Sequence, residues 1–301
     1  MGVIYIVAAE EGAGKTAIGA GLAINLLNSG KKVGYLKPQA AESDSDIAFM
    51  KKIPGLEVLK KETSLLKGRD IVLVEAKLEN QTSDAARKMK AKVIAVEAYT
   101  EKVLKYANAY KQLGEDLLGV IINRVPQGQL KRIKKEAAEK YGAVGIKVLG
   151  IIPENRILLA ITIGELAEGI GGKILNHKEK SGELVENYML GAMTVDSGLD
   201  YFGRKKNKAA IIRQERLDMQ LAALETSTSC LVLSGGDVTP AYKVRQKAES
   251  RGIPIITTDA AVSDIVTSID KLLGKPSLNQ EKKLIKLADT VKQSLDLKVF
   301  G

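Results

Sequence analysis

Cysteine, histidine and tryptophan are nearly absent from this chain. Its 301 residues include one cysteine, one histidine and no tryptophan. Cys230 has no partner in the chain for a disulfide, and His177 has no second histidine with which to build a zinc or haem site. We therefore expect neither thiol chemistry nor a site for these metals.

Long apolar segments are missing as well. The most apolar stretch, residues 147–166, is interrupted by Pro153, Glu154 and Arg156, which makes it too polar for a bilayer span. The N-terminal residues have no basic region and no small-residue cleavage site, so they do not resemble a signal peptide. We expect a soluble, cytoplasmic protein with no membrane partner.

Basic residues outnumber acidic ones by 46 to 36, which gives a net charge of +10. Such a charge would suit a nucleic-acid partner. The lysines, however, lie mostly on predicted helix faces among acidic residues, as at Lys131, Lys134 and Lys135. Only three phenylalanines are available for base stacking. The sequence therefore favours solvated helix faces over nucleic-acid binding.

Short apolar segments rich in β-branched residues alternate with segments of helical period in the first half of the chain. This alternation is typical of an α/β fold with a doubly wound, mostly parallel sheet. After the first apolar run, Ile18, Leu22 and Leu26 share one helix face, and Gly30 ends that helix. The apolar runs are residues 3–8, 32–36, 71–74, 93–96, 118–122 and 148–152.

The alternation of strand-like and helical segments restarts after the apolar run at residues 148–152. We therefore predict one α/β domain over residues 1–153, a smaller α/β domain over 154–272 and a C-terminal helix within 273–301. Apolar residues recur at helical spacing in that last segment, as at Leu287 and Val291. The strand-like segments of the second domain are residues 188–192, 209–212, 230–233 and 253–257.

Residues 9–16, AEEGAGKT, fit the phosphate-loop pattern GxxxxGK[ST] except that Ala9 replaces the first glycine. The loop lies between a predicted strand and a predicted amphipathic helix, which is the context this motif requires. Glycines let N–H groups curl around phosphate oxygens, Lys15 can neutralise their charge, and the Thr16 hydroxyl can ligate Mg²⁺. We expect ATP and Mg²⁺ as ligands; a chance turn is the alternative. The predicted phosphate-binding residues are Glu11, Gly12, Ala13, Gly14, Lys15, Thr16 and Ala17.

Two charged residues stand at the carboxyl ends of predicted strands, the edge where doubly wound sheets bind ligands. Glu75 ends the third run and can hold Mg²⁺ directly or through water. An ordinary strand-end charge is the alternative. Lys37 ends the second strand, directly before Pro38.

Short motifs around these residues resemble dethiobiotin synthetase in order and approximate spacing. They are KP at residues 37–38, SDIA at 45–48 and LVEA at 73–76, together with the acid Glu10 in the phosphate loop. The resemblance covers the first predicted domain. It implies a P-loop NTPase fold of the dethiobiotin synthetase type.

The resemblance also implies roles for single residues. Lys37 would join Lys15 as a catalytic residue, near the transferred phosphoryl group or the substrate carboxylate. Asn123 matches the asparagine that contacts the base edge in this family, although a turn residue at a strand end would look the same. The residues implied around Mg²⁺ are Thr16, Asp46 and Glu75.

The chain departs from dethiobiotin synthetase at the substrate side. The family has a glycine-rich loop after the strand-end glutamate, whereas AKLE occupies residues 76–79 here. Ala41 stands where the family has serine. These departures concern the biotin-precursor pocket and leave the ATP pocket intact.

Residues 185–270 resemble the DRTGG domain, with Glu215 and Ser234 in place of the name-giving aspartate and threonine. The whole chain resembles the N-terminal half of long phosphate acetyltransferases, where a dethiobiotin-synthetase-like module and a DRTGG domain precede an acyltransferase domain, and the resemblance ends where that third domain would begin. The matching motifs of the second domain are GAMT at 191–194, ERLD at 215–218, AALETS at 222–227 and SGG at 234–236.

Two features of the second domain allow a functional or a structural interpretation. Gly235 and Gly236 permit a tight turn. This turn either binds an anion through its exposed N–H groups or serves only to reverse the chain. Arg216 and Asp218 either bind a polar ligand or form a structural ion pair, and the ion pair is slightly favoured.

The sequence leaves three functions open. The favoured hypothesis is a regulatory module that binds ATP and Mg²⁺ in the first domain and either senses a metabolite or docks a partner through the second. Its possible partners are a second copy in a homodimer, or a separate acyltransferase or other metabolic enzyme. The alternative is an enzyme, either a slow ATPase or a ligase of the dethiobiotin synthetase type that activates a carboxylate. Nucleic-acid binding ranks last.

Overall fold

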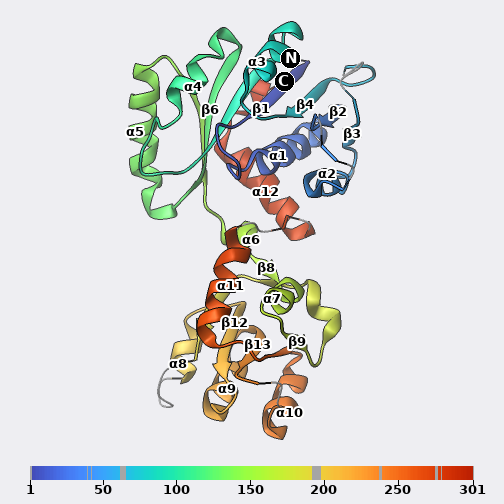
Figure 1. Cartoon of the computed structure of the whole chain (residues 1–301), viewed down its shortest axis with the longest axis vertical. Coiled ribbons are helices and arrows are strands. Elements are labelled where there is room, and N and C mark those ends of the chain that lie inside the picture. Colours follow the sequence, from blue (N-terminus) through green and yellow to red (C-terminus); the bar gives the residue numbers. More distant parts are fainter. Residues whose placement is uncertain are drawn as a thin grey trace. The chain divides into compact units, whose positions relative to one another are not determined.

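The computed structural model describes residues 2–38, 40–41, 43–61, 66–191, 198–236, 239–274, 277–278 and 280–300. The chain divides into two compact units (Figure 1). The first unit consists of Met1–Asn155 and Leu278–Gly301, and the second of Arg156–Ser277. The C-terminal segment therefore returns to the first unit, so the second unit is an insertion within it.

The first unit is built on a seven-stranded sheet in which all neighbouring strands are parallel. The strand order is β3-β2-β4-β1-β5-β6-β7, so β1 lies at the centre. This order confirms the predicted doubly wound sheet and adds β3, a three-residue edge strand too short for the sequence pattern to detect. The strands are β1 (Val3–Val7), β2 (Val33–Leu36), β3 (Glu57–Leu59), β4 (Ile71–Glu75), β5 (Lys92–Ala98), β6 (Leu117–Val125) and β7 (Val148–Pro153).

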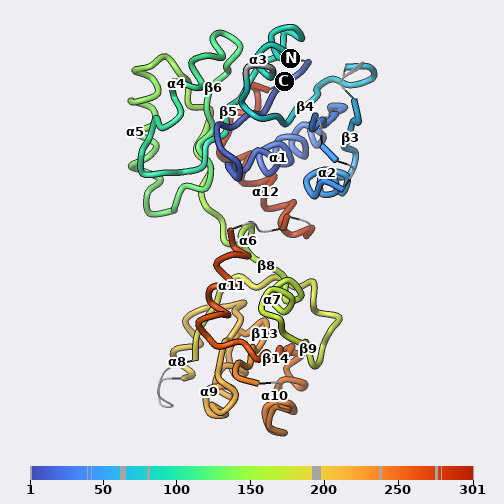
Figure 2. The backbone as a smooth tube through the Cα atoms, in the orientation of Figure 1, coloured from blue at the N-terminus to red at the C-terminus, as the bar shows by residue number. Residues whose placement is uncertain are grey.

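Helices cover both faces of this sheet (Figure 2). Tyr5 and Val7 of β1 pack into the apolar core under α3, α4 and α5, whereas Ile6 faces Gly19 of α1 on the other side. This alternation follows from the period of two along a strand. The α-helices are α1 (Lys15–Asn28), α2 (Ser45–Met50), α3 (Asn80–Lys88), α4 (Ala107–Lys111), α5 (Leu130–Ala143) and α12 (Glu281–Ser294), and the 3₁₀ helices are η1 (Gly114–Asp116), η2 (Gln127–Gln129) and η5 (Leu297–Phe300).

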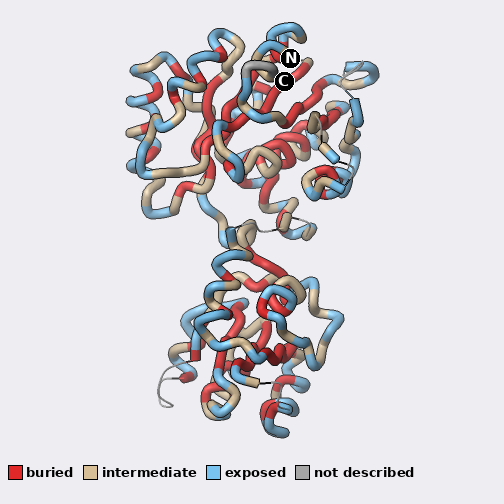
Figure 3. Tube along the Cα trace, viewed as in Figure 1, coloured by how far each residue is buried: buried red, intermediate tan, exposed pale blue. Residues whose placement is uncertain are grey.

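The second unit contains a five-stranded sheet of order β11-β12-β13-β14-β9, in which only β9 is antiparallel to its neighbour. Separate apolar cores lie on its two faces, and Figure 3 shows the buried residues of this unit in red. The predicted end of β11 at Ala192 lies outside the described residues. The strands are β8 (Ile161–Thr162), β9 (Lys173–Ile174), β10 (Leu184–Val185), β11 (Asn187–Leu190), β12 (Lys208–Arg213), β13 (Thr228–Ser234) and β14 (Ile255–Thr258).

Short helices complete the second unit. Helix α7 begins with a capping box in which Thr162 and Glu165 each accept a backbone N–H of the other residue. No helix within the described residues of the chain has the length and apolarity needed to cross a membrane. The helices are α6 (Arg156–Leu159), α7 (Ile163–Gly169), η3 (Lys178–Gly182), α8 (Gly198–Gly203), α9 (Leu217–Leu224), α10 (Tyr242–Arg251) and α11 (Val262–Gly274).

Candidate functional site

The predicted phosphate loop, residues 9–16, covers most of the connection from the central strand β1 to α1 and the first two residues of α1, at the carboxyl edge of the sheet. Gly12 and Gly14 both have positive φ angles, 74° and 97°, a conformation that L side chains rarely adopt. A Cβ at position 14 would also lie 2.1 Å from Asn123 Nδ2. No side chain among the described residues caps the start of α1, so its first N–H groups are available to an anion.

Lys15 is the residue of this loop at which α1 begins, and Asn123 contacts the loop backbone. The Lys15 side chain is half-buried and forms no hydrogen bond or ion pair with any other residue that the structure describes. Asn123, at the end of β6, is 6% exposed. Its Nδ2 donates to the Ala13 carbonyl over 2.9 Å and its Oδ1 accepts the Arg124 N–H. Asn123 thus fixes the loop backbone, and contact with a base stays a prediction.

The structure brings Thr16 and Glu75 together. The Thr16 hydroxyl donates to Glu75 Oε1 over 3.0 Å, and the Tyr35 hydroxyl donates to Glu75 Oε2 over 2.7 Å. Burial raises the pKa of Glu75, an effect that the Tyr35 hydrogen bond and the Lys15 charge oppose. Sequence reasoning missed Tyr35 because it lies within an apolar strand; only the alignment of β2 with β4 reveals its contact.

Lys37 lies between two aspartates. Its Nζ is 2.6 Å from Asp46 Oδ2 and 2.9 Å from Asp44 Oδ2. Burial opposes the charge of Lys37, but the hydrogen bonds to Asp46 and Asp44 outweigh it and raise the pKa of Lys37. Asp44 was not predicted. It caps α2 by accepting the N–H groups of Asp46 and Ile47, and its place just before a helix was the available signal.

The two acids of the phosphate loop are both paired. Tyr106 donates to Glu10 Oε2 over 2.5 Å, and Lys105 Nζ lies 3.4 Å from the same oxygen. Lys77 Nζ lies 3.2 Å from Glu11 Oε1. These contacts partly offset the repulsion that two carboxylates would exert on a phosphate.

No group of three or more His, Cys, Asp or Glu side chains within the described ranges could hold a metal ion. A cation at Glu75 would therefore need the Thr16 hydroxyl and oxygens from a bound molecule. Cys230 is fully buried, and burial raises the pKa of its thiol to about 12, which makes it an unreactive thiol.

The two ambiguous features of the second unit have structural contacts. The N–H groups of Gly235 and Gly236 both point to the Thr258 carbonyl, at 3.1 and 3.3 Å, so they are not free for an anion. Arg216 Nη2 lies 2.9 Å from Asp218 Oδ2. The GAMT motif falls on residues 192–194, outside the described part of the chain, apart from its first glycine.

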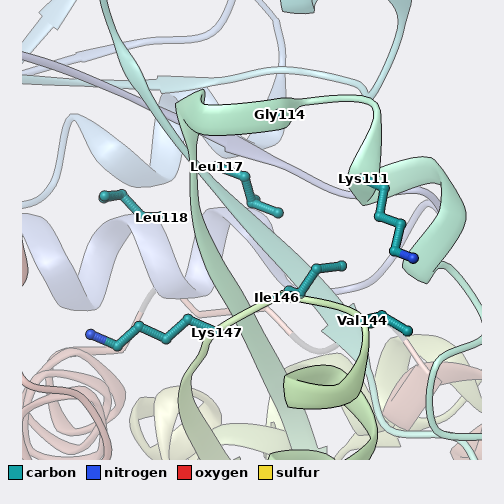
Figure 4. Close-up of a pocket in the computed structure, with 8 residues that line it drawn as sticks. Lys111, Gly114, Leu117, Leu118, Val144, Ile146 and Lys147 are labelled. Atoms are coloured by element: carbon teal, nitrogen blue, oxygen red, sulfur yellow. The ribbon is translucent and has the colours of Figure 1, made fainter.

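A cavity of about 430 Å³ lies at the opposite edge of the first sheet, where β6 and β7 begin (Figure 4). Leu117 and Ile146 line it, and Lys111 and Lys147 extend from it in different directions. Asn123 lies at the far end of β6, so the cavity is separate from the phosphate loop. Its two lysines do not converge on a common ligand position.

The chain is similar to several known proteins. Over 93% of its length the chain is 24% identical to a phosphate acetyltransferase from Nitratidesulfovibrio vulgaris, of which it spans 48%, the N-terminal half. Among solved structures, it is similar to the MinD cell division protein of Aquifex aeolicus (20% identity, 53% of this chain and 85% of that one, TM-score 0.38).

It is also similar to the CBS and DRTGG regulatory region of Clostridium perfringens pyrophosphatase, crystallised with diadenosine tetraphosphate (16% identity, 48% of this chain and 70% of that one, TM-score 0.35). Residues 165–272 match the DRTGG domain. Residues 4–162, just over half of the chain, match the CobQ/CobB/MinD/ParA nucleotide binding domain. The chain therefore belongs to the CobQ/CobB/MinD/ParA family of nucleotide-binding domains and carries a DRTGG domain, in the order found in the N-terminal half of phosphate acetyltransferase.

Proposed function

We propose that the first unit binds ATP with Mg²⁺ and that the chain acts as a regulatory or sensing module. One observation carries the nucleotide site: the Thr16 hydroxyl meets the buried Glu75 carboxylate at the start of α1. Within the part of the chain that the structure describes, no side chain caps this helix start and none pairs with the Lys15 ammonium. This arrangement offers N–H groups and an ammonium to phosphates, and a hydroxyl and a carboxylate to a cation.

The donor set fits Mg²⁺, which prefers oxygen ligands and is bound through one or two carboxylates together with substrate phosphates. Thr16 and Glu75 would hold it, with Asp46, whose side chain is 37% exposed, as a further acceptor. When bound, the cation would neutralise phosphate charge. Asn123 would stay on the base side of the loop.

The regulatory interpretation is supported by the surroundings of Lys37. A lysine that stabilises a transferring phosphoryl group must contact that group. The Lys37 ammonium instead pairs with the carboxylates of Asp44 and Asp46, so it would have to leave them to reach a phosphoryl group. Lys77, where dethiobiotin synthetase has its glycine-rich substrate loop, pairs with Glu11. The second unit would then sense a metabolite, and a second copy or a separate acyltransferase would receive the signal.

The binding proposal is tested with Lys15→Ala, measured by calorimetry with MgATP and by thermal melting. Charge-assisted hydrogen bonds contribute about 1.5–3 kcal/mol, so we expect affinity to fall about 10- to 100-fold while the melting temperature stays the same. Lys131→Ala, an exposed lysine on α5, is the matched control. Equal affinity in all three proteins would refute the phosphate-loop assignment.

The regulatory proposal is tested by assaying purified protein for three reactions. We expect slow ATP hydrolysis, no conversion of diaminopelargonate and CO₂ to dethiobiotin, and no acetyl phosphate from acetyl-CoA. Dethiobiotin formation in the coupled assay would instead favour the ligase.

A further inference from the structure

Tyr35 and Glu75 form a buried pair beneath α1. Strands β2 and β4 are adjacent and parallel, with Tyr35 opposite Leu73. Because side chains alternate along a strand, Leu73 and Glu75 share a face, and Tyr35 lies on the same face. The Tyr35 ring is fully buried, and a Cβ on Gly19 of α1 would lie 3.9 Å from it. The phenol is therefore held where its hydroxyl reaches Glu75.

The two oxygens of Glu75 have different surroundings. Oε2 accepts the Tyr35 hydroxyl, on the strand side. Oε1 accepts the Thr16 hydroxyl at the first turn of α1, on the side of the phosphate loop. A carboxylate that is fixed through one oxygen presents the other in a defined direction. The Tyr35 hydrogen bond therefore determines that Oε1 points toward Thr16.

We propose that Tyr35 is a positioning residue that holds the Glu75 carboxylate toward Thr16, so that the two can receive the divalent cation accompanying the nucleotide. This inference rests on the proposed nucleotide-binding function. A purely space-filling role for the ring is the competing explanation, and the two differ only in what the hydroxyl does.

The variant Tyr35→Phe keeps the ring and removes the hydroxyl. We would measure ATP affinity by calorimetry, once with Mg²⁺ and once with EDTA. The ratio of the two affinities is the magnesium-dependent gain in affinity. Loss of a group that orients a metal ligand typically costs about 10- to 100-fold in metal affinity. We expect the gain to fall at least about tenfold while affinity in EDTA is unchanged.

The chain provides a matched control. Tyr141 of α5 is also fully buried and donates to a buried carboxylate, Glu97 of β5, in the same unit. Tyr141→Phe removes an equivalent hydrogen bond from a different carboxylate than the one that accepts the Thr16 hydroxyl. We expect both tyrosine variants to lower the melting temperature. Only Tyr35→Phe should reduce the magnesium-dependent gain in ATP affinity.

A double variant separates positioning from general damage. Once Glu75→Gln has removed the charge that Tyr35 orients, adding Tyr35→Phe should cause no further loss of the gain. An unchanged gain in Tyr35→Phe, or equal losses with Mg²⁺ and with EDTA, would overturn this inference alone. Wild-type protein that fails to bind ATP would overturn the proposed function and this inference together.

Discussion

Lys208, the first residue of β12, is fully buried. Its Nζ donates to Thr226 Oγ1 and to the Ser227 carbonyl, each over 2.8 Å, and lies 5.9 Å from the centre of the Phe202 ring. No carboxylate within the described residues pairs with it. Burial lowers the pKa of this lysine from 10.5 to about 8, because the interior disfavours its charged form.

This depressed pKa predicts a pH-dependent contribution to stability. Between about pH 8 and 10.5 the unfolded chain keeps the Lys208 proton and the folded chain does not, so this group's contribution to stability rises with pH in that window. Below pH 8 both states are charged and the folded state bears the full cost of burial, roughly 3 kcal/mol for such a shift. The stability of Lys208→Met relative to wild type should therefore be highest at pH 7. This relative stability should fall as the pH rises to 10.

Melting temperatures of both proteins from pH 7 to pH 10 at constant ionic strength would measure this difference. The exposed Lys205→Met controls for the loss of a lysine charge. If the difference between wild type and Lys208→Met did not change with pH, Lys208 would not be titrating in that range.

At the scale of secondary structure, α12 packs against α1. Val291 and Leu287 are buried, and Asn25 Nδ2 donates to the Ala288 carbonyl over 2.9 Å. A Cβ at Gly21 would lie 2.4 Å from Val291 Cγ2 and 3.3 Å from the Leu287 carbonyl. The two helices therefore approach closely because position 21 has no side chain.

Gly21→Ala should destabilise the protein. Overpacking of a fitted contact costs about 1–3 kcal/mol, which exceeds the gain of about 1 kcal/mol from replacing a helix glycine when the contact cannot relax. Thermal melting would measure the loss. Adding Val291→Ala should recover part of it by making room.

Gly142→Ala is the control for this experiment, since position 142 lies in α5 with open space around it. There we expect no loss, or a slight gain in melting temperature. Equal effects at positions 21 and 142 would mean that α12 does not pack tightly on α1.

The sequence was sufficient to predict the longer strands and α12 but not their partners. Apolar runs between helical segments identified six strands of the first sheet, and strand-end chemistry placed Glu75 near Thr16. The contacts of Tyr35 and Asp44 depend on which strands and loops become neighbours, which no local pattern encodes. The period of α12 showed a helix with one apolar face and did not indicate that the face would cover α1.

At the scale of the whole molecule, the return of the chain to the first unit changes how that unit can be isolated. All predicted phosphate, metal and base contacts lie before Pro153, within the first domain predicted from the sequence. The structure adds Leu278–Gly301 to the same unit. A cut after Pro153 would remove α12 and expose the face of α1 that contains Gly21 and Asn25.

We therefore predict different behaviour for two fragments. Residues 1–155 joined by a flexible glycine-serine linker to residues 278–301 should fold and bind MgATP within about threefold of the full chain, because this fragment keeps α12 and every proposed ligand contact. Residues 1–155 alone should melt at a lower temperature, since burial of the α1 face contributes roughly 25 cal/mol per Å². Circular dichroism and calorimetry would compare both with the full chain. A joined fragment that folds without binding ATP, when the full chain binds it, would show that ATP binding requires residues 156–277.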